Sequence, residues 1–316
     1  MKLPIAIVIP TLNCREKLVR HLDAIEEWLP HVGQIIAIDS QSTDGTFELL
    51  QERLLPYGAQ VISAEKGLYQ CWNQAAQLAI QPYLYYSTIC DVITQSGLQE
   101  MTDIMIKNDL DVVISNPKIV SDQGEAISNI KWPIHYILRY LNYSDDVALY
   151  SGEDLAKLVP LFLPATLLGS SASNLYRSEV IKKHPFPLSV GIVGDSLWAV
   201  KYLPKLKVGI TRKEYAIFCW DGVRNGTWDK DGSFMQQFSE EADKLKLEYP
   251  LPHIDYVIIH SVNAYITDEC KRLQAAVNEY DYYVKFLTRP LGVKAKDIFF
   301  KYTSVRYWLG RLFPRE

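Results

Sequence analysis

The sequence predicts an α/β fold in which a mainly parallel sheet is flanked by helices and followed by a helical C-terminal extension. Over the first 115 residues, short β-branched apolar runs alternate with segments of helical periodicity. Repeated strand–helix–strand units of this kind form parallel sheets with right-handed crossovers. From about residue 233 onward the pattern is helical. A chain of 316 residues can hold one large domain and an extension, which we expect at 1–230 and 231–316.

The predicted strands are short apolar runs without helical spacing, which is typical of strands buried on both faces. They are residues 5–10, 34–40, 59–64, 83–88 and 111–115. The helices between them follow from apolar residues three or four positions apart, such as Leu18, Leu22 and Ile25. They are expected near residues 18–29, 47–54, 72–79 and 97–107. Ligands of parallel sheets bind beyond the carboxyl ends of the strands, so the residues after each strand are the informative ones.

Composition excludes several classes of protein. The formal net charge of -4 argues against nucleic acid as a partner, because nucleic-acid binding usually leaves a basic footprint. The first strand is followed by neither a dinucleotide-binding glycine pattern nor a P-loop. The five cysteines form no C-x-x-C pair, which indicates a reducing compartment. No signal peptide and no membrane-spanning apolar run is recognised, and we therefore expect a cytoplasmic protein.

Polar residues follow the first two strands. In "PTLN", Thr11 and Asn13 could present oxygen atoms and backbone N–H groups to a ligand, or Asn13 could simply cap the first helix. Asp39 ends the second strand, where it could accept hydrogen bonds from a ribose or a base. The residues from Ser42 to Thr46 are expected to form a turn that caps the second helix.

Three motifs in order, "IAIVIPTLN", "IIAIDSQSTDGT" and "EKGLYQCWNQA", resemble those of the family 2 glycosyltransferases with the GT-A fold. The resemblance covers residues 3–100 well and extends more weakly to about residue 225. It implies a pocket for a nucleotide-sugar donor formed by Pro10, Thr11, Asn13, Asp39, Lys66, Gly67 and Asn73. Asp39 would contact the uracil or ribose, and Asn73 would support the pocket or reach the diphosphate. Lys66 could equally be a solvated surface lysine.

The family pattern also places an Asp-x-Asp metal site after the fourth strand. Here Thr88 and Cys90 stand where the two carboxylates would be, and Asp91 follows them. The resemblance implies that Asp91 holds Mg²⁺ or Mn²⁺ in a weakened site, with Thr88 beside the donor. The alternative is that Asp91 only caps a helix.

Two later segments resemble the acceptor half of the family. In "VGIVGDSLWAVKYL" the usual Glu-Asp pair is Gly194 and Asp195, and Asp195 would be the general base or else a helix cap. "LLGSSASNLYR", with Ser170 and Ser171, would help to form the acceptor pocket. In "CWDGVRNGTW", Arg224 would pair with the diphosphate or be a surface arginine.

The resemblance implies an inverting glycosyltransferase of the hexosyl-transferring type. It would move a sugar from a nucleotide-diphospho-sugar, uridine-linked, to a hydroxyl of a carbohydrate or lipid-linked acceptor in polysaccharide or glycolipid assembly. The alternative is a nucleotide-sugar binding protein of the same fold with weakened or lost transfer. The basic, aromatic tail at 294–315 could dock on the inner face of an anionic membrane or pack as a helix.

Overall fold

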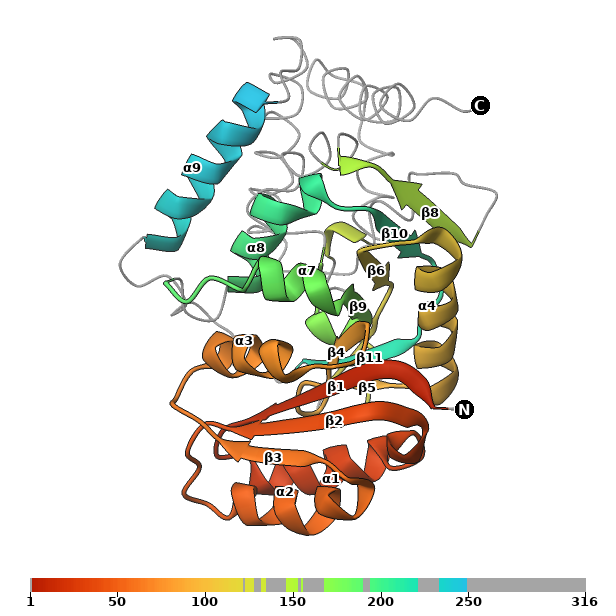
Figure 1. The fold of residues 1–316 in the computed structure, drawn as a ribbon, viewed down its shortest axis with the longest axis vertical. Coiled ribbons are helices and arrows are strands. Elements are labelled where there is room, and N and C mark those ends of the chain that lie inside the picture. The colour runs from red at the N-terminus through yellow and green to blue at the C-terminus, as the bar shows by residue number, and fades with distance from the viewer. Residues whose placement is uncertain are drawn as a thin grey trace, which may run out of the picture.

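The computed structural model describes residues 2–121, 123–127, 132–134, 146–152, 155, 168–189, 194–220 and 233–248 (Figure 1). The strands are β1 (Leu3–Thr11), β2 (Val32–Asp39), β3 (Gln60–Ser63), β4 (Tyr83–Tyr86), β5 (Val92–Ile93), β6 (Val112–Ser115), β7 (Lys118–Ser121), β8 (Val147–Tyr150), β9 (Asn174–Arg177), β10 (Val208–Thr211) and β11 (Ala216–Trp220). The α-helices are α1 (Arg15–Ile25), α2 (Thr46–Leu54), α3 (Leu68–Leu78), α4 (Gln95–Asn108), α7 (Ser178–Lys183), α8 (Gly194–Tyr202) and α9 (Ser233–Glu248). Short 3₁₀ turns are η1 (Leu29–His31), η2 (Leu55–Tyr57), η3 (Ser171–Ser173) and η5 (Leu203–Lys205).

The central sheet has eight strands in the order β3-β2-β1-β4-β9-β6-β10-β8. From β3 to β4 all neighbours are parallel, and the register pairs Thr11 with Asp39 and Asp39 with Ser63. This half confirms the predicted parallel sheet. β9 runs antiparallel to both β4 and β6, and β8 runs antiparallel to β10. The strand–helix alternation did not predict β9, because the alternation is recognised only over the first 115 residues and β9 lies beyond them. A second sheet has the order β5-β11-β7.

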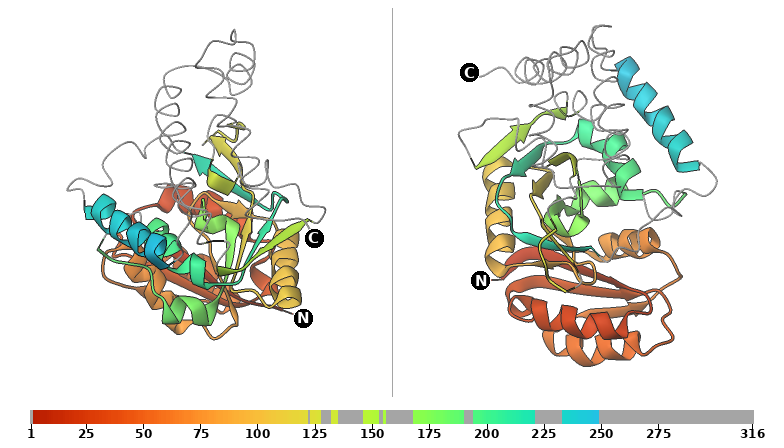
Figure 2. Two further views of the ribbon diagram at one scale, coloured as in Figure 1. Left: turned by 90° about the horizontal axis from the view of Figure 1, so that it is seen from above. Right: turned by 180° about the vertical axis from the view of Figure 1, so that it is seen from behind.

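Hydrophobic side chains cover both faces of the sheet. Along β1, Ile5, Ile7 and Ile9 point into a core shared with α1, α2 and α4. The alternating residues Ala6 and Val8 point into the opposite core, shared with α3, α7 and α8. Figure 2 shows α1 and α2 side by side below the first three strands. Burial on both faces explains why β1 is a continuous apolar run.

The predicted first helix, residues 18–29, is two elements in the structure. Ile25 ends α1, and Pro30 lies in the separate turn η1, because proline tolerates the first turn of a helix but not its interior. At its other end α1 begins earlier than predicted, at Arg15. The helix predicted near residues 97–107 corresponds to α4, which is capped by the Thr94 hydroxyl accepting from the Gly97 backbone N–H (3.0 Å).

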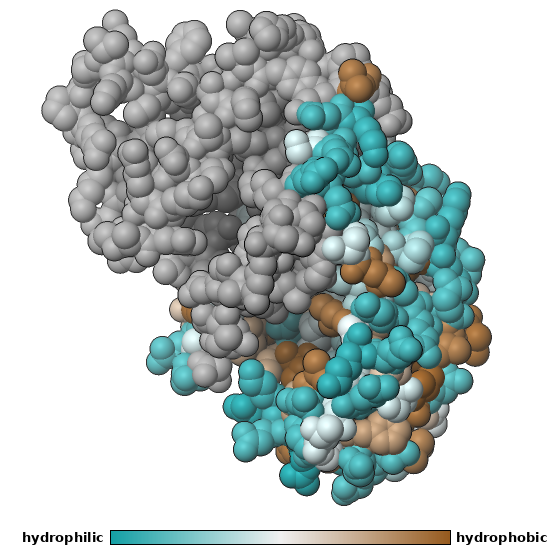
Figure 3. All heavy atoms as spheres, turned by 90° about the vertical axis from the view of Figure 1, so that its left-hand side faces the viewer, coloured by the Kyte–Doolittle hydropathy of each residue, from teal (hydrophilic) through white to brown (hydrophobic). Residues whose placement is uncertain are grey.

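The helix α9 is the described part of the predicted extension, and it lies against α8. Ser189 Oγ donates to Gln237 Oε1 (2.9 Å), and Lys201 Nζ lies 4.0 Å from Glu241 Oε1. The predicted division at residue 230 stays a prediction, and the tail at 294–315 lies outside the described residues. Within the part of the chain that the structure describes, no helix is both long and apolar enough to span a membrane. On the face in Figure 3, hydrophobic residues of the described part are dispersed among hydrophilic ones.

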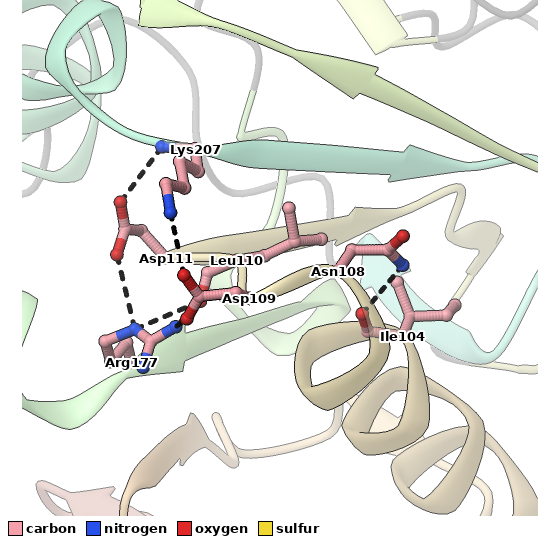
Figure 4. Close-up of polar contacts among 7 residues, drawn as sticks. All are labelled: Ile104, Asn108, Asp109, Leu110, Asp111, Arg177 and Lys207. Atoms are coloured by element: carbon pink, nitrogen blue, oxygen red, sulfur yellow. Dashed lines mark hydrogen bonds and ion pairs between the residues drawn. The ribbon is translucent and has the colours of Figure 1, made fainter.

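An ion-pair cluster closes the amino edge of the sheet (Figure 4). Arg177, at the end of the antiparallel β9, donates through Nη2 to Asp109 Oδ1 (2.7 Å) and to the Leu110 carbonyl (2.8 Å). Asp111, which precedes β6, lies 3.3 Å from Arg177 Nε and accepts from the Lys207 backbone N–H (2.9 Å). The cluster therefore joins β6, β9 and β10 at the edge opposite the predicted site.

Replacing Arg177 with methionine is expected to lower the free energy of unfolding by roughly 1–2 kcal/mol, because the Leu110 carbonyl and the two carboxylates lose charge-assisted donors. Lys207→Met, which removes a solvent-exposed partner of Asp109, should have a much smaller effect. Urea unfolding of both variants measures the difference. Equal losses of unfolding free energy in the two variants would show that the contact with the Leu110 carbonyl does not contribute to stability.

Candidate functional site

The carboxyl ends of β1 and β2 form a compact polar network around Asp39. The Asp39 side chain accepts from the Thr11 hydroxyl (2.9 Å), the Ser42 hydroxyl (2.6 Å) and the Ser42 backbone N–H (2.7 Å). Asp39 is 1% exposed, so these protein donors replace water around its carboxylate. Pro10, one residue before Thr11 in β1, is buried. The structure thus brings Thr11 and Asp39 together at the predicted edge, with Asp39 facing inward.

Asn13 connects this network to the turn after β2. It has a left-handed backbone (φ 44°), donates its backbone N–H to Ser42 Oγ (2.8 Å) and accepts through Oδ1 from the Thr43 backbone N–H (2.9 Å). The alternative that Asn13 caps the first helix is wrong, because Cys14 is the N-cap residue and makes no side-chain capping bond. Asn13 instead fixes the loop after β1 against the loop after β2.

The segment before α3 carries the next predicted residues. Gly67 has φ 152°, a backbone conformation that L side chains rarely adopt, so this entry to α3 favours glycine. Lys66 is exposed. Asn73 donates to the Phe186 carbonyl and accepts from the Phe186 backbone N–H, both at 2.8 Å. The Asn73 amide therefore fastens α3 to the loop that leads to α8.

Asp91 lies where three segments of the chain meet. Its Oδ2 accepts from the Thr88 hydroxyl (2.6 Å) and the Ser170 hydroxyl (3.3 Å), and its Oδ1 accepts from the Cys219 backbone N–H (2.9 Å). Asp91 is 4% exposed. The alternative that it caps a helix is wrong, because Thr94 caps α4. Asp91 joins the loop after β4 to β11 and to the Gly169–Ser170 turn.

This environment does not fit a divalent cation. Both oxygens of Asp91 already accept hydrogen bonds from protein donors, whereas Mg²⁺ and Mn²⁺ need several oxygen ligands of their own. Among the residues that the structure describes, no three His, Cys, Asp or Glu side chains gather in a way that could hold a metal. The predicted metal role of Asp91 is not supported by this geometry.

A buried histidine lies beneath the loop after β4. His21 Nε2 is 3.0 Å from the Ser87 hydroxyl, and His21 Nδ1 has no partner among the described residues. Burial lowers the pKa of His21 from 6.5 to about 4. The imidazole is therefore neutral in the folded protein at neutral pH, and it contacts the strand end that precedes Thr88 and Asp91.

The free energy of unfolding is expected to fall by about 2 kcal/mol between pH 7 and pH 5 because of His21. The folded pKa lies below the unfolded value, so between pH 6.5 and 4 the unfolded chain binds the additional proton and gains stability. Urea unfolding at several pH values measures this slope. The His21→Gln variant should have a flatter slope than the wild type in this window, and parallel curves would contradict the prediction.

Asp195 lies in the first turn of α8, where the helix dipole favours a negative charge. Its Oδ1 accepts from the Tyr69 hydroxyl (3.0 Å) and from the Ser196 backbone N–H (2.7 Å). Tyr69 belongs to α3, which starts close to the carboxyl ends of β2 and β3. The start of α8, 126 residues away in sequence, is thereby held at the same edge of the sheet as Thr11 and Asp39.

The structure thus gathers most of the predicted residues along one edge, but Arg224 lies outside the described residues. Sequence reasoning did not foresee the hydrogen bonds that hold them, which come from Ser42, Tyr69, Ser170 and the backbone of Cys219. Ser42 had a signal, since a serine three positions after a strand-end aspartate is suited to a local turn. The other contacts join segments far apart in the sequence, and no local pattern reports them.

Comparison with solved structures defines the class of the fold. S. aureus TarS residues 1–349 in complex with UDP matches with a TM-score of 0.58 and 15% identity, covering 92% of this chain and 76% of that chain. The same TarS fragment with UDP-GlcNAc matches with a TM-score of 0.56 and 15% identity, covering 92% and 77%. The mannosyltransferase PcManGT from Pyrobaculum calidifontis, in complex with GDP-Man and Mn²⁺, matches with a TM-score of 0.52 and 14% identity, covering 100% and 89%. The fold is that of the GT-A glycosyltransferases.

A family model matches the N-terminal part of the chain. The family model "Glycosyl transferase family 2" matches residues 6–153, a range that begins within β1 and includes β2 to β8. No curated protein matches the sequence significantly. Residues 6–153 of the chain are therefore similar to glycosyl transferase family 2, as the motifs in this part of the sequence predict.

Proposed function

We propose that the protein is an inverting hexosyltransferase that uses a nucleotide-diphospho-sugar, uridine-linked, and a hydroxyl acceptor in polysaccharide or glycolipid assembly. The observation that carries the proposal is the position of Asp195. The hydrogen bond from Tyr69 holds this carboxylate at the edge where the predicted donor residues Thr11 and Asp39 lie. A carboxylate and a donor pocket on one edge of the sheet are the two parts that direct transfer requires.

In the proposed reaction, Asp195 removes the proton of the acceptor hydroxyl while that oxygen attacks the anomeric carbon. The new bond joins the acceptor oxygen to the anomeric carbon. The bond from the anomeric carbon to the diphosphate oxygen breaks, and the nucleoside diphosphate leaves with the electron pair. Attack from the side opposite the leaving group inverts the configuration. The proton stays on Asp195 until solvent removes it.

The donor pocket is proposed to use Pro10, Thr11, Asn13, Asp39, Lys66, Gly67, Asn73 and Thr88. Complexes of TarS with UDP and UDP-GlcNAc support a uridine-linked donor, whereas the complex of PcManGT with GDP-Man supports a guanosine-linked one. We favour uridine because the TarS fragment has the higher TM-score. Ser42, half-buried beside Asp39, is the donor that a bound base or ribose would displace. Arg224 remains proposed as a diphosphate contact.

A second candidate is a nucleotide-sugar binding protein with weakened or lost transfer. Asp91 favours it, because the single carboxylate left from the metal motif is buried and bonded to protein donors. PcManGT was solved with Mn²⁺, and a divalent cation is retained here as a proposal to test rather than as part of the reaction. No step of the proposed reaction depends on a divalent cation.

Release of nucleoside diphosphate from UDP-GlcNAc, UDP-glucose, UDP-galactose and GDP-mannose, with and without Mn²⁺, separates the two candidates. Turnover of at least one donor is the expected result. Tight binding of a donor without any turnover would favour the binding protein. Once an acceptor is found, the anomeric configuration of the new glycosidic bond, compared with that of the donor, tests the inversion.

We also propose a cytoplasmic enzyme whose basic, aromatic tail at 294–315 contacts the inner face of the membrane. The support is the sequence of the tail alone. The full chain should then sediment with anionic vesicles at low salt and be released at high salt. A chain that ignores such vesicles would contradict the membrane contact without affecting the proposed reaction.

A further inference from the structure

The contact between Tyr69 and Asp195 is a long-range hydrogen bond between the first turns of two helices. Tyr69 is the second residue of α3, and Asp195 is the second residue of α8. The distance from the phenol oxygen to Oδ1 is 3.0 Å. Asp195 is half-buried, whereas Tyr69 is 3% exposed. A rigid, buried donor therefore meets a carboxylate that reaches solvent.

Neighbouring rings fix the orientation of Tyr69. Its ring stacks on Phe186 with centroids 5.6 Å apart and meets Trp72 edge-on at 5.2 Å. The Asn73 side chain is hydrogen-bonded to both the backbone N–H and the carbonyl of Phe186, so the stacking partner of Tyr69 is itself fixed. Burial and the charge of Asp195 raise the pKa of Tyr69 well above its usual value. The phenol therefore stays protonated and can only donate toward the carboxylate.

The residue before Asp195 makes room for this ring. A Cβ at Gly194 would lie 2.7 Å from Tyr69 Cδ2, from Tyr69 Cε2 and from the Pro187 carbonyl oxygen. Real Cβ atoms do not approach other atoms this closely, and one of the obstacles is backbone that cannot rotate away. Gly194 thus lets the Tyr69 ring pack directly on the start of α8.

We propose that Tyr69 is a positioning residue for Asp195: its hydroxyl orients the carboxylate and stabilises its charged form at the site of transfer. In this proposal the Tyr69 hydroxyl acts through Asp195 and does not itself contact the substrate. The inference rests on the proposed function, in which Asp195 is the general base. It adds that the base is held from α3, the helix that directly follows the predicted donor contacts Lys66 and Gly67.

Tyr69 from α3 and Tyr176 from β9 both interact electrostatically with Asp195. Burial keeps Tyr176 protonated as well, because its pKa is also raised. The Lys201–Glu241 pair lies further along α8, where that helix packs on α9.

The first test needs no substrate. Carboxyl ¹³C NMR of the full chain follows the titration of Asp195, with its signal identified by its loss in Asp195→Asn. In Tyr69→Phe we expect the midpoint to move to higher pH by roughly one unit, because a donor to the charged form is lost. Tyr86→Phe is the matched control, since Tyr86 lies in the same aromatic cluster and donates to the Trp72 carbonyl instead.

The second test uses turnover of the donor from the panel that reacts fastest. Tyr69→Phe should lower kcat roughly tenfold with little change in donor KM, and Tyr86→Phe should change neither. In the Asp195→Asn background, Tyr69→Phe should have no further effect, because a residue that acts through Asp195 loses its role with it.

The outcomes separate the inference from the function beneath it. Unchanged turnover in Asp195→Asn would refute the base assignment, while the NMR midpoint would still decide whether Tyr69 stabilises the carboxylate. A large loss in Asp195→Asn, together with a wild-type midpoint and wild-type kcat in Tyr69→Phe, would overturn the positioning role alone. Equal additional losses in both backgrounds would assign Tyr69 a purely structural role.

Discussion

Replacing Asp195 with asparagine is expected to lower turnover by about 10²- to 10⁴-fold and to leave donor binding intact. Asparagine keeps a carbonyl oxygen that can accept from Tyr69 and from the Ser196 backbone N–H, so the start of α8 should keep its shape. What the amide lacks is the ability to take a proton from the acceptor hydroxyl. Steady-state release of nucleoside diphosphate gives kcat, and calorimetry gives the donor Kd.

Asp103→Asn is the control for this substitution. Asp103 is an exposed residue of α4 that accepts from the Gln99 side chain, and it lies away from the site. Its variant should match the wild type in both kcat and donor Kd. If Asp195→Asn turned over at the wild-type rate, Asp195 would be only a residue of the first helical turn, and another group would have to accept the proton.

Replacing Asp91 with alanine is expected to lower the free energy of unfolding by about 3 kcal/mol or more. The Thr88 hydroxyl, the Ser170 hydroxyl and the Cys219 backbone N–H would all lose their acceptor, the Ser170 hydroxyl in a buried place and the other two in partly buried ones. Asp91→Asn, which keeps one acceptor oxygen, should lose about half as much. Urea unfolding of the wild type and both variants gives this order, with exposed Asp103→Ala as the control of small effect.

A titration with Mn²⁺ distinguishes this structural role from metal binding. If Asp91 serves as the centre of a hydrogen-bond network, Mn²⁺ should not raise the Tm of the wild-type protein through Asp91. A metal ligand would give the opposite pattern: a Mn²⁺-dependent rise in Tm that Asp91→Ala abolishes, with little loss of stability in the absence of metal. That pattern would restore the metal role implied by the family motif.

The first half of the fold was predictable because the buried face of each strand and helix can be recognised from the spacing of apolar residues within that element. The apolar run of β1 reports burial on both faces, and the spacing of Leu18, Leu22 and Ile25 reports one buried side of α1. The same holds for the strand ends, since parallel strands put Thr11 and Asp39 next to each other whenever the register is right. Helix boundaries were less accurate, as the separation of η1 from α1 at Pro30 shows.

What the sequence left open depends on distant partners. Whether a carboxylate binds a ligand or the protein is decided by which donors reach it. For Asp91 these come from residues 170 and 219, well beyond the range of any motif. The ring of Tyr69 packs in the core, but its hydroxyl also reaches a residue of α8. Helical periodicity predicts that the ring is buried, but it does not predict the hydrogen-bond partner of the hydroxyl.

The position of β9 has a consequence for how the chain is made. β1 to β4 and their helices are complete in the first 86 residues, but the strand that pairs with the free side of β4 is residues 174–177. During synthesis the N-terminal half can therefore emerge from the ribosome and collapse while one edge of β4 still lacks its partner. Open edges of this kind invite pairing with other nascent chains. Cells that make this protein rapidly should benefit from a chaperone that shields this edge until β9 arrives.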